Sequence, residues 1–168
     1  MRPIAFLLYL NAEQDFCSIP LENDTVKETE GSRLAAVQKI FDDAAYIRHL
    51  GIKLTKVGNG WCQTELLVKP EHGQQHGTVH AGVISTLADH TAGGAARAAS
   101  AAHQDVVTIE FKINFLRPGT GNRLEGEGKA LRAGKRVIVA ESEVFGFENG
   151  ERVLIAKCMS SLAVIPQR

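Results

Sequence analysis

One carboxylate, Asp89, stands inside an alanine-rich segment that directly follows a loop rich in glycine and histidine. The alanines favour a helix, and their short side chains let other parts of the protein approach it closely. An acid on such a face must be hydrogen-bonded, paired or used in chemistry, because burying a bare charge is costly. The competing interpretation is an ordinary exposed carboxylate on a helix surface. Asp89 is therefore the first candidate for a reactive group.

The loop in front of this helix could supply the second half of a reaction site. Residues 78–82, Thr-Val-His-Ala-Gly, stand where the first helical turn begins. Unpaired backbone N–H groups and the positive end of the helix dipole point out of such a turn. They can hold the oxygen of a polarised carbonyl, as an oxyanion hole does. Gly73, Gly77 and Gly82 would let a ligand approach the backbone, although a plain flexible loop has the same composition.

Ala81 and Asp89 are eight residues apart, so one helix separates them by roughly 12 Å. One carbonyl group cannot be held by the Ala81 amide and attacked with the help of Asp89 from the same chain. Two antiparallel copies of the helix, packed across a two-fold axis, would place Ala81 of one chain near Asp89 of the other. The sequence therefore predicts that an enzyme built on these residues is an obligate dimer with two composite sites.

Other reaction sites find little support in the sequence. His72, His76 and His80 are evenly spaced like metal ligands, but the glycines between them argue against one helix that would align the imidazoles. No Cys-x-x-Cys pair is present to suggest a structural zinc site. Ser85 has no nucleophile elbow around it, and no phosphate-binding or dinucleotide-binding loop occurs. We therefore expect neither a metal nor a cofactor.

The elements that must position Asp89 follow from hydrophobic spacing and turn residues. One helix is expected from Arg33 to Leu50, closed by Gly51, and the central helix extends to about Ala102. Strands are predicted at residues 52–57, 61–68, 106–116, 123–131, 136–147 and 152–164. Short connections between consecutive strands imply antiparallel pairing. The chain is thus predicted to be an α+β domain in which one helix covers one face of an antiparallel sheet.

The strand at 106–116 has the clearest pattern. Its apolar residues, expected to share one face on the core, are Val107, Ile109, Phe111, Ile113 and Phe115. The polar residues between them are Thr108, Glu110, Lys112 and Asn114. Glu110 and Lys112 are expected in solvent, whereas Thr108 comes closest to the end of the central helix and could reach a site.

Length and composition indicate one soluble domain. With 168 residues, we expect an N-terminal extension at 1–30 and a single folded domain at 31–168. Nineteen basic residues balance nineteen acidic ones, so no overall field favours nucleic acid or an anionic membrane. The apolar run at 4–10 is short for a signal peptide and far too short for a membrane span. Three cysteines without a close pair suit reduced thiols, and we expect a cytoplasmic protein.

Three motifs follow one another along the chain. The first is Gln74-Gln75-His76-Gly77-x-x-His80-Ala81-Gly82 with Leu87-Ala88-Asp89 beyond it, and the others are residues 110–119 (EFKINFLRPG) and Gly134-Lys135-Arg136. In this order they resemble the PaaI-like acyl-CoA thioesterases of the hotdog fold. The resemblance covers about residues 33–165. It implies a long helix wrapped by an antiparallel sheet, with active sites at the dimer interface and dimers that commonly pair into tetramers.

The resemblance also implies roles for single residues. Asp89 corresponds to the catalytic carboxylate, acting as general base for water or as nucleophile on the thioester. Ala81 stands where the family has a glycine whose backbone amide polarises the thioester carbonyl, and the following Gly82 completes the motif around the substrate. Gln74 and Thr108 fall where relatives carry residues that orient substrate or water. His80 belongs to the motif without a settled role.

A thioester is already activated, so a base and a polarising dipole suffice and no metal is required. Phosphates of coenzyme A call for positive groups, and the candidates are Arg117, Lys135 and Arg136, which could equally be solvated turn charges. Two alternatives stay open. One is a non-catalytic acyl-CoA sensor on the same fold; the other is a hotdog dehydratase acting on hydroxyacyl thioesters, for which His80 would pair with a carboxylate. The acyl group, the choice of dimer or tetramer and the role of residues 1–30 cannot be inferred from the sequence.

Overall fold

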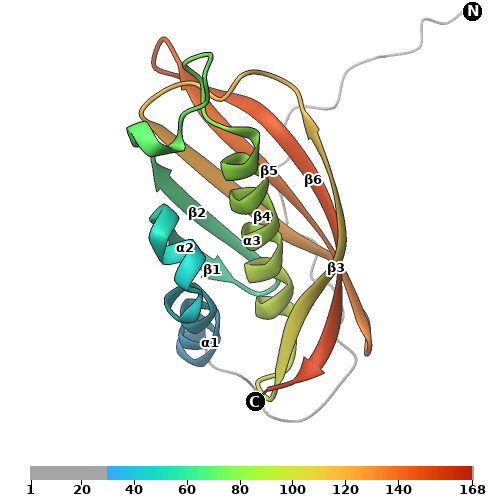
Figure 1. Ribbon diagram of the computed structural model, residues 1–168. Helices are drawn as coiled ribbons and strands as arrows, with labels where there is room; N and C mark the ends of the chain where they lie inside the picture. Colours follow the sequence, from blue (N-terminus) through green and yellow to red (C-terminus); the bar gives the residue numbers. More distant parts are fainter. Residues whose placement is uncertain (1–29, 168) are drawn as a thin grey trace, which may run out of the picture.

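Figure 1 shows a computed structural model of the chain, which describes residues 30–167. The predicted extension at 1–30 lies outside the described residues apart from Glu30, so this boundary stays a prediction. In chain order the helices and strands are α1 (Glu30–Asp43), α2 (Ala45–Leu50), β1 (Ile52–Gly58), β2 (Trp61–Leu67), a 3-10 turn (Pro70–His72), α3 (Ala81–Ala99), β3 (Gln104–Phe115), β4 (Arg123–Ala133), β5 (Val137–Glu148) and β6 (Glu151–Pro166).

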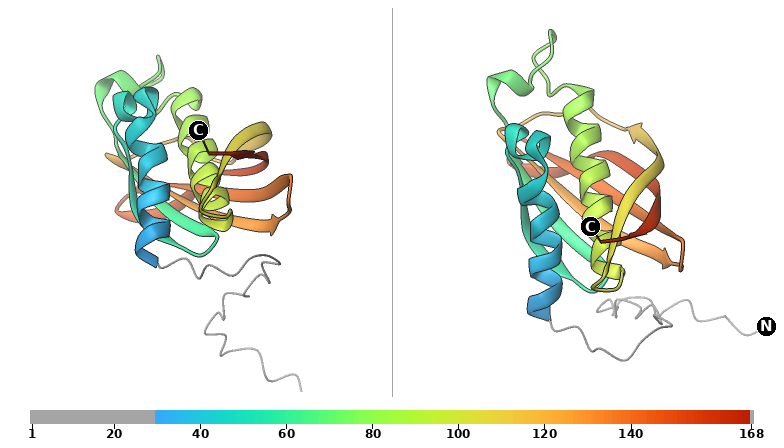
Figure 2. Two further views of the ribbon diagram at one scale, coloured as in Figure 1. Left: turned by 90° about the horizontal axis from the view of Figure 1, so that it is seen from below. Right: turned by 60° about the horizontal axis from the view of Figure 1, so that its bottom comes forward.

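The six strands form one antiparallel sheet in the order β1-β2-β4-β5-β6-β3. α3 crosses one face of this sheet, called the inner face below, and contacts every strand (Figure 1). α1 lies beside α3 on the same face (Figure 2). The predicted α+β architecture, with a long helix covering an antiparallel sheet, is confirmed. None of the helices within residues 30–167 is long and apolar enough to cross a membrane.

Small residues let α3 settle directly on the sheet. Ala92, Ala95 and Ala96 are fully buried. The smaller of two hydrophobic clusters, which is lined by alanines, joins the C-terminal half of α3 to β4, β5 and β6. On β4, a Cβ added to Gly128 would lie 2.5 Å from the Thr91 carbonyl oxygen. Helix backbone and strand backbone are therefore in near contact, a distance that only glycine permits.

The first predicted helix is divided in two. Ala44 is extended (φ −77°, ψ 99°) and separates α1 from α2, so a single helix over 33–50 was wrong. The guanidinium of Arg48 donates to the carbonyl of Asp42, which satisfies an acceptor at the end of α1. The predicted cap at Gly51 is confirmed by its left-handed φ of 80°.

β3 contains a bulge that the sequence pattern concealed. Thr108 pairs with Leu162 and Glu110 pairs with Ser161, which leaves Ile109 without a partner. Paired residues share a face, and Leu162 is buried in the core, so Thr108 faces inward. Beyond the bulge the alternation is reversed, and Glu110 faces outward.

The expectation that the apolar residues of β3 share one buried face is therefore wrong. Val107, before the bulge, is on the outer face, whereas Phe111, Ile113 and Phe115, after it, face α3. Only Ile113 packs against the core, and the exposed fractions of the others are 52% for Val107, 59% for Ile109, 42% for Phe111 and 47% for Phe115. β3 is an edge strand, so these side chains lack a neighbour on one side.

Candidate active site

The structure brings Asp89 and Thr108 together. Thr108 Oγ1 donates a hydrogen bond of 3.0 Å to Asp89 Oδ1, joining the middle of α3 to β3. No other side chain within residues 30–167 bonds to this carboxylate, so Oδ2 is left for another donor. The bulge at Ile109 makes this contact possible, because it sets Thr108 on the face opposite to Glu110.

Asp89 is half-buried, which changes its acidity. Burial raises the pKa of its carboxyl group, and the hydrogen bond from Thr108 opposes that rise. A carboxylate with a raised pKa accepts a proton more readily than an exposed one. The competing interpretation of Asp89 as an exposed helix carboxylate does not fit this environment.

At the start of α3 one backbone amide is left free. His80 is the N-cap, and its Nδ1 accepts the Gly82 N–H at 2.9 Å, while its carbonyl accepts from Val83 and Ile84. No group within residues 30–167 accepts the Ala81 N–H, which is the amide predicted to hold a carbonyl oxygen. A Cβ on Gly82 would lie 3.0 Å from His80 Nδ1, so glycine here makes room for the cap.

The loop before α3 is ordered by its own hydrogen bonds. Gln74 Nε2 donates to Thr78 Oγ1 at 2.8 Å, and the Gln74 N–H donates to the Thr78 carbonyl. Gly77 turns the chain with φ 77°, and the His80 N–H donates to the carbonyl of His72. Gln74 is thus held in the same loop that presents the Ala81 amide.

The three evenly spaced histidines do not converge. His72 is buried, with Nδ1 accepting the Lys69 N–H, whereas His80 is exposed at the helix start. Within residues 30–167 no three His, Cys, Asp or Glu side chains are arranged to hold a metal ion.

The candidate phosphate-binding residues are separated within one chain. Arg117 follows the end of β3, where its Nη1 donates to the Leu154 carbonyl at 2.9 Å. Lys135 and Arg136 are exposed in the β4–β5 turn, and the Arg136 carbonyl accepts from Val164, near the start of β3. Arg117 is therefore separated from Lys135 and Arg136 by about the length of β3, roughly 40 Å.

Ala81 and Asp89 are likewise apart in one chain. α3 is continuous from Ala81 to Ala99, so their separation follows the helical rise and is roughly 12 Å.

Sequence reasoning missed the side chains that fasten α3 beneath Asp89. Ser142 Oγ donates to the Ala88 carbonyl at 2.7 Å, and Cys62 Sγ donates to the Thr91 carbonyl at 3.2 Å. Ser142 and Cys62 come from β5 and β2, and both are buried. Glycines at 126 and 128, alternating within a predicted strand, were the available signal of a close helix approach.

The helix is also fixed by a pair of threonines. Thr91 Oγ1 donates to the Leu87 carbonyl at 2.6 Å, so the 2.6 Å contact between Thr64 and Thr91 hydroxyls must use the Thr64 proton. These contacts hold α3 against β2, next to Asp89 in the chain but on another side of the helix.

Known proteins resemble this chain in sequence. Residues 76–152 match the model of the thioesterase superfamily. A Saccharolobus solfataricus protein named as an esterase is 35% identical over 133 residues, which are 79% of this chain and 92% of that protein. The medium/long-chain acyl-CoA thioesterase YigI of Salmonella typhimurium is 26% identical, over 70% of this chain and 83% of that protein.

The fold is also that of a solved PaaI structure. The Escherichia coli PaaI protein from the phenylacetic acid degradation operon superposes with a TM-score of 0.73, over 82% of this chain and 96% of that one. Because the two sequences are only 19% identical, this similarity shows a shared fold and nothing more. The chain belongs to the thioesterase superfamily, a family of thioester hydrolases, and has the PaaI-like hotdog fold.

Proposed function

We propose that the chain is an acyl-CoA thioesterase that hydrolyses an acyl- or aryl-CoA to the free acid and coenzyme A. The observation that carries the proposal is the 3.0 Å hydrogen bond from Thr108 to Asp89, made by the helix whose first amide, at Ala81, is free. The acyl-CoA activity in the name of the Salmonella relative supports a coenzyme A thioester as substrate.

In the proposed reaction Asp89 is the general base. Thr108 holds Oδ1, and Oδ2 takes a proton from a water molecule whose oxygen bonds to the thioester carbon. The carbonyl oxygen becomes an oxyanion, which the Ala81 N–H and the positive end of α3 stabilise. When the intermediate collapses, the C–S bond breaks and the proton on Asp89 passes to the coenzyme A thiolate. Gln74, held by Thr78 in the loop that leads to Ala81, orients the substrate.

We propose that each site uses Ala81 of one chain and Asp89 of its partner. The roughly 12 Å between them in one chain is too long for one carbonyl group to meet both. The edge strand β3 supports a partner, because its free edge has no neighbouring strand within residues 30–167, and Phe111 and Phe115 are exposed on the α3 side.

The helix start allows the Ala81 N–H to be removed by a substitution to proline. Ala81 is the first residue of α3, a position that tolerates proline because its N–H has no helical partner. His80, with φ −62° and ψ 137°, already has the extended conformation required before proline. Ala81→Pro should therefore fold and dimerise while lowering kcat by roughly 10²–10³, the usual cost of one oxyanion donor. Ala81→Gly, which keeps the amide, is the matched control and should stay close to wild type.

Mixed dimers test whether the sites are shared. A dimer of one Ala81→Pro chain and one Asp89→Asn chain, purified with two different tags, should recover about half of the wild-type turnover, since one composite site is intact. The readout is release of coenzyme A thiol from acyl-CoA. A mixed dimer as inactive as its two parent dimers would instead place Ala81 and Asp89 of the same chain in each site.

A further inference from the structure

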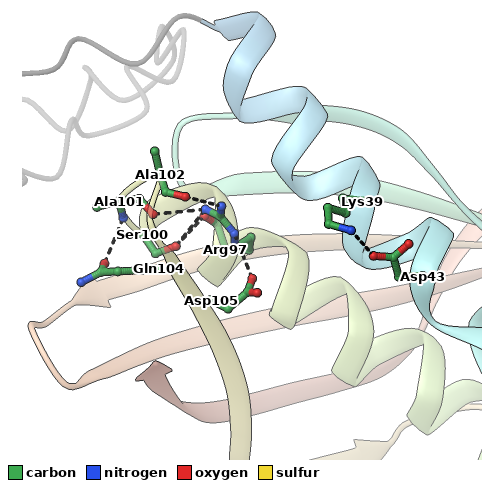
Figure 3. A network of polar contacts seen from close by, with 8 residues as sticks. All are labelled: Lys39, Asp43, Arg97, Ser100, Ala101, Ala102, Gln104 and Asp105. Atoms are coloured by element: carbon green, nitrogen blue, oxygen red, sulfur yellow. Dashed lines mark hydrogen bonds and ion pairs between the residues drawn. The ribbon is translucent and has the colours of Figure 1, made fainter. Parts of the chain in front are cut away.

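One buried guanidinium holds the connection between α3 and β3. Arg97, in the last turn of α3, is 2% exposed. Its Nη1 donates to Ser100 Oγ at 3.1 Å and to the Ala101 carbonyl at 3.4 Å, and its Nη2 donates to the Ala102 carbonyl at 3.1 Å. Figure 3 shows the side chain turned from the helix into this connection.

Asp105 ties the start of β3 to the same guanidinium. Its Oδ1 lies 3.2 Å from Arg97 Nε, although the Nε–H makes no directed hydrogen bond within residues 30–167. The contact is therefore a short-range attraction of opposite charges, which an uncharged asparagine does not reproduce. Because a buried guanidinium without a counter-charge is costly, Asp105 fixes where β3 begins relative to α3.

The same two elements meet again at Asp89 and Thr108. Asp89 lies eight residues before Arg97 on α3, roughly 12 Å, and Thr108 lies three residues after Asp105 on β3, roughly 10 Å. A slip of β3 by one residue, roughly 3.3 Å, would remove Thr108 from hydrogen-bonding distance. We infer that the Arg97–Asp105 pair is a positioning pair that keeps Thr108 on the carboxylate of Asp89. This inference rests on the proposed catalytic role of Asp89.

The direction in which the Asp89 pKa changes in a variant distinguishes a lost position of Thr108 from a direct effect of the Asp105 charge. The groups that face Asp89 are the Thr108 hydroxyl from β3 and, from β6, the thiol of Cys158, whose pKa is raised mainly by burial and also by the Asp89 charge. Losing the Thr108 hydrogen bond raises the pKa of Asp89. Removing the negative charge of Asp105, or leaving Arg97 unpaired, would by itself lower that pKa. A rise after Asp105→Asn therefore reports lost positioning.

The test is an NMR titration of the Asp89 carboxyl carbon in the full-length protein, with the signal assigned by its loss in Asp89→Asn. Thr108→Val should raise the Asp89 pKa by about 1 pH unit, the effect of one hydrogen bond to a charged group. Asp105→Asn should raise the Asp89 pKa by less. In the Thr108→Val variant, the same substitution should cause no further rise of this pKa. Arg97→Lys, which keeps the charge but loses the planar fork, should act in the same direction and serves if Asp105→Asn does not fold.

Glu127→Gln is the matched control, because it removes an ion pair with Arg152 that has no link to α3 and should leave the Asp89 titration unchanged. An Asp89 pKa that is unchanged or lowered in both Asp105→Asn and Arg97→Lys overturns the inference. The inference is also overturned if Asp105→Asn raises the Asp89 pKa as much in the Thr108→Val variant as it does in the wild-type protein. The titration needs no substrate, so turnover by Asp89→Asn judges the proposed function separately.

Discussion

The two faces of the sheet carry polar side chains in opposite ways. On the outer face three cations lie among five carboxylates in a ladder of exposed ion pairs: Arg123 with Glu65 and Glu125, Arg152 with Glu125 and Glu127, and Lys157 with Glu141 and Glu143. Above the inner face the carboxylate of Asp89, on α3, has one hydrogen-bond donor within residues 30–167, Thr108, and buried hydroxyl groups hold this helix against the sheet.

The difference lies in how much each contact matters. Each of these three cations has two carboxylate partners, and water screens the pairs, so the loss of one contact is readily compensated. Asp89 has one partner in a partly desolvated site, where a single hydrogen bond changes its acidity. The outer face thus holds many charged side chains whose single contacts matter little, whereas the acidity of Asp89, the proposed base, depends on one contact.

Asp89→Asn should give the largest effect on activity. Without the carboxylate that we propose as the base, turnover of acyl-CoA should fall by roughly 10³, within the usual range for general base catalysis, while the assembly stays that of wild type. Release of coenzyme A thiol measures the rate, and size-exclusion chromatography checks assembly. Hydrolysis at the wild-type rate would remove Asp89 from the mechanism.

The same substitution should stabilise the folded state at neutral pH. The folded pKa of Asp89 is raised above its ordinary value of 3.8, so its charged form costs stability at pH values above the folded pKa. That cost disappears as the pH falls through the folded pKa, and none remains below 3.8. Thermal unfolding at equal protein concentration should show a higher Tm for Asp89→Asn at pH 7 and no such advantage near pH 3.5. A lower Tm at pH 7 would contradict the desolvated environment.

Sequence spacing was sufficient to predict the order of the six strands and the central helix, because turn residues and short connections leave few ways to arrange them. It also placed the helix start near Ala81 and Asp89 within that helix, since both stand in a local motif. The Thr108–Asp89 contact was harder. Strict alternation in β3 suggested that Thr108 shares a face with Glu110, and the bulge that separates them depends on the register with β6, a non-local property. Arg97 was missed for a similar reason: its partners become neighbours only when the chain reverses after α3.

Gly128→Ala should give the next largest effect, on stability. Its new Cβ would lie 2.5 Å from the Thr91 carbonyl oxygen, a backbone atom that cannot move without shifting α3. Overpacking of this kind costs about 1–3 kcal/mol, so Tm should fall by several degrees. Because α3 carries Asp89, kcat should fall as well. Gly150→Ala is a contrasting control, since a Cβ there meets no atom within 4 Å and the strain comes only from its φ of 86°. Equal activity losses in the two variants would contradict tight seating of α3.

Glu127→Gln should give the smallest effect, and it tests the outer face directly. The substitution removes one carboxylate from Arg152 but leaves Glu125, whose Oε2 lies 2.9 Å from Arg152 Nε, and leaves the guanidinium 3.4 Å from the centre of the Phe145 ring. An exposed pair with a second partner in place is worth a few tenths of a kcal/mol, so Tm should change by no more than about 1 °C in a chain of this size. Turnover should match wild type because nothing in the ladder reaches α3. A loss of several degrees, or one that grows in high salt, would mean that the outer ladder stabilises the fold as strongly as the buried contacts, and the distinction between the two faces would fail.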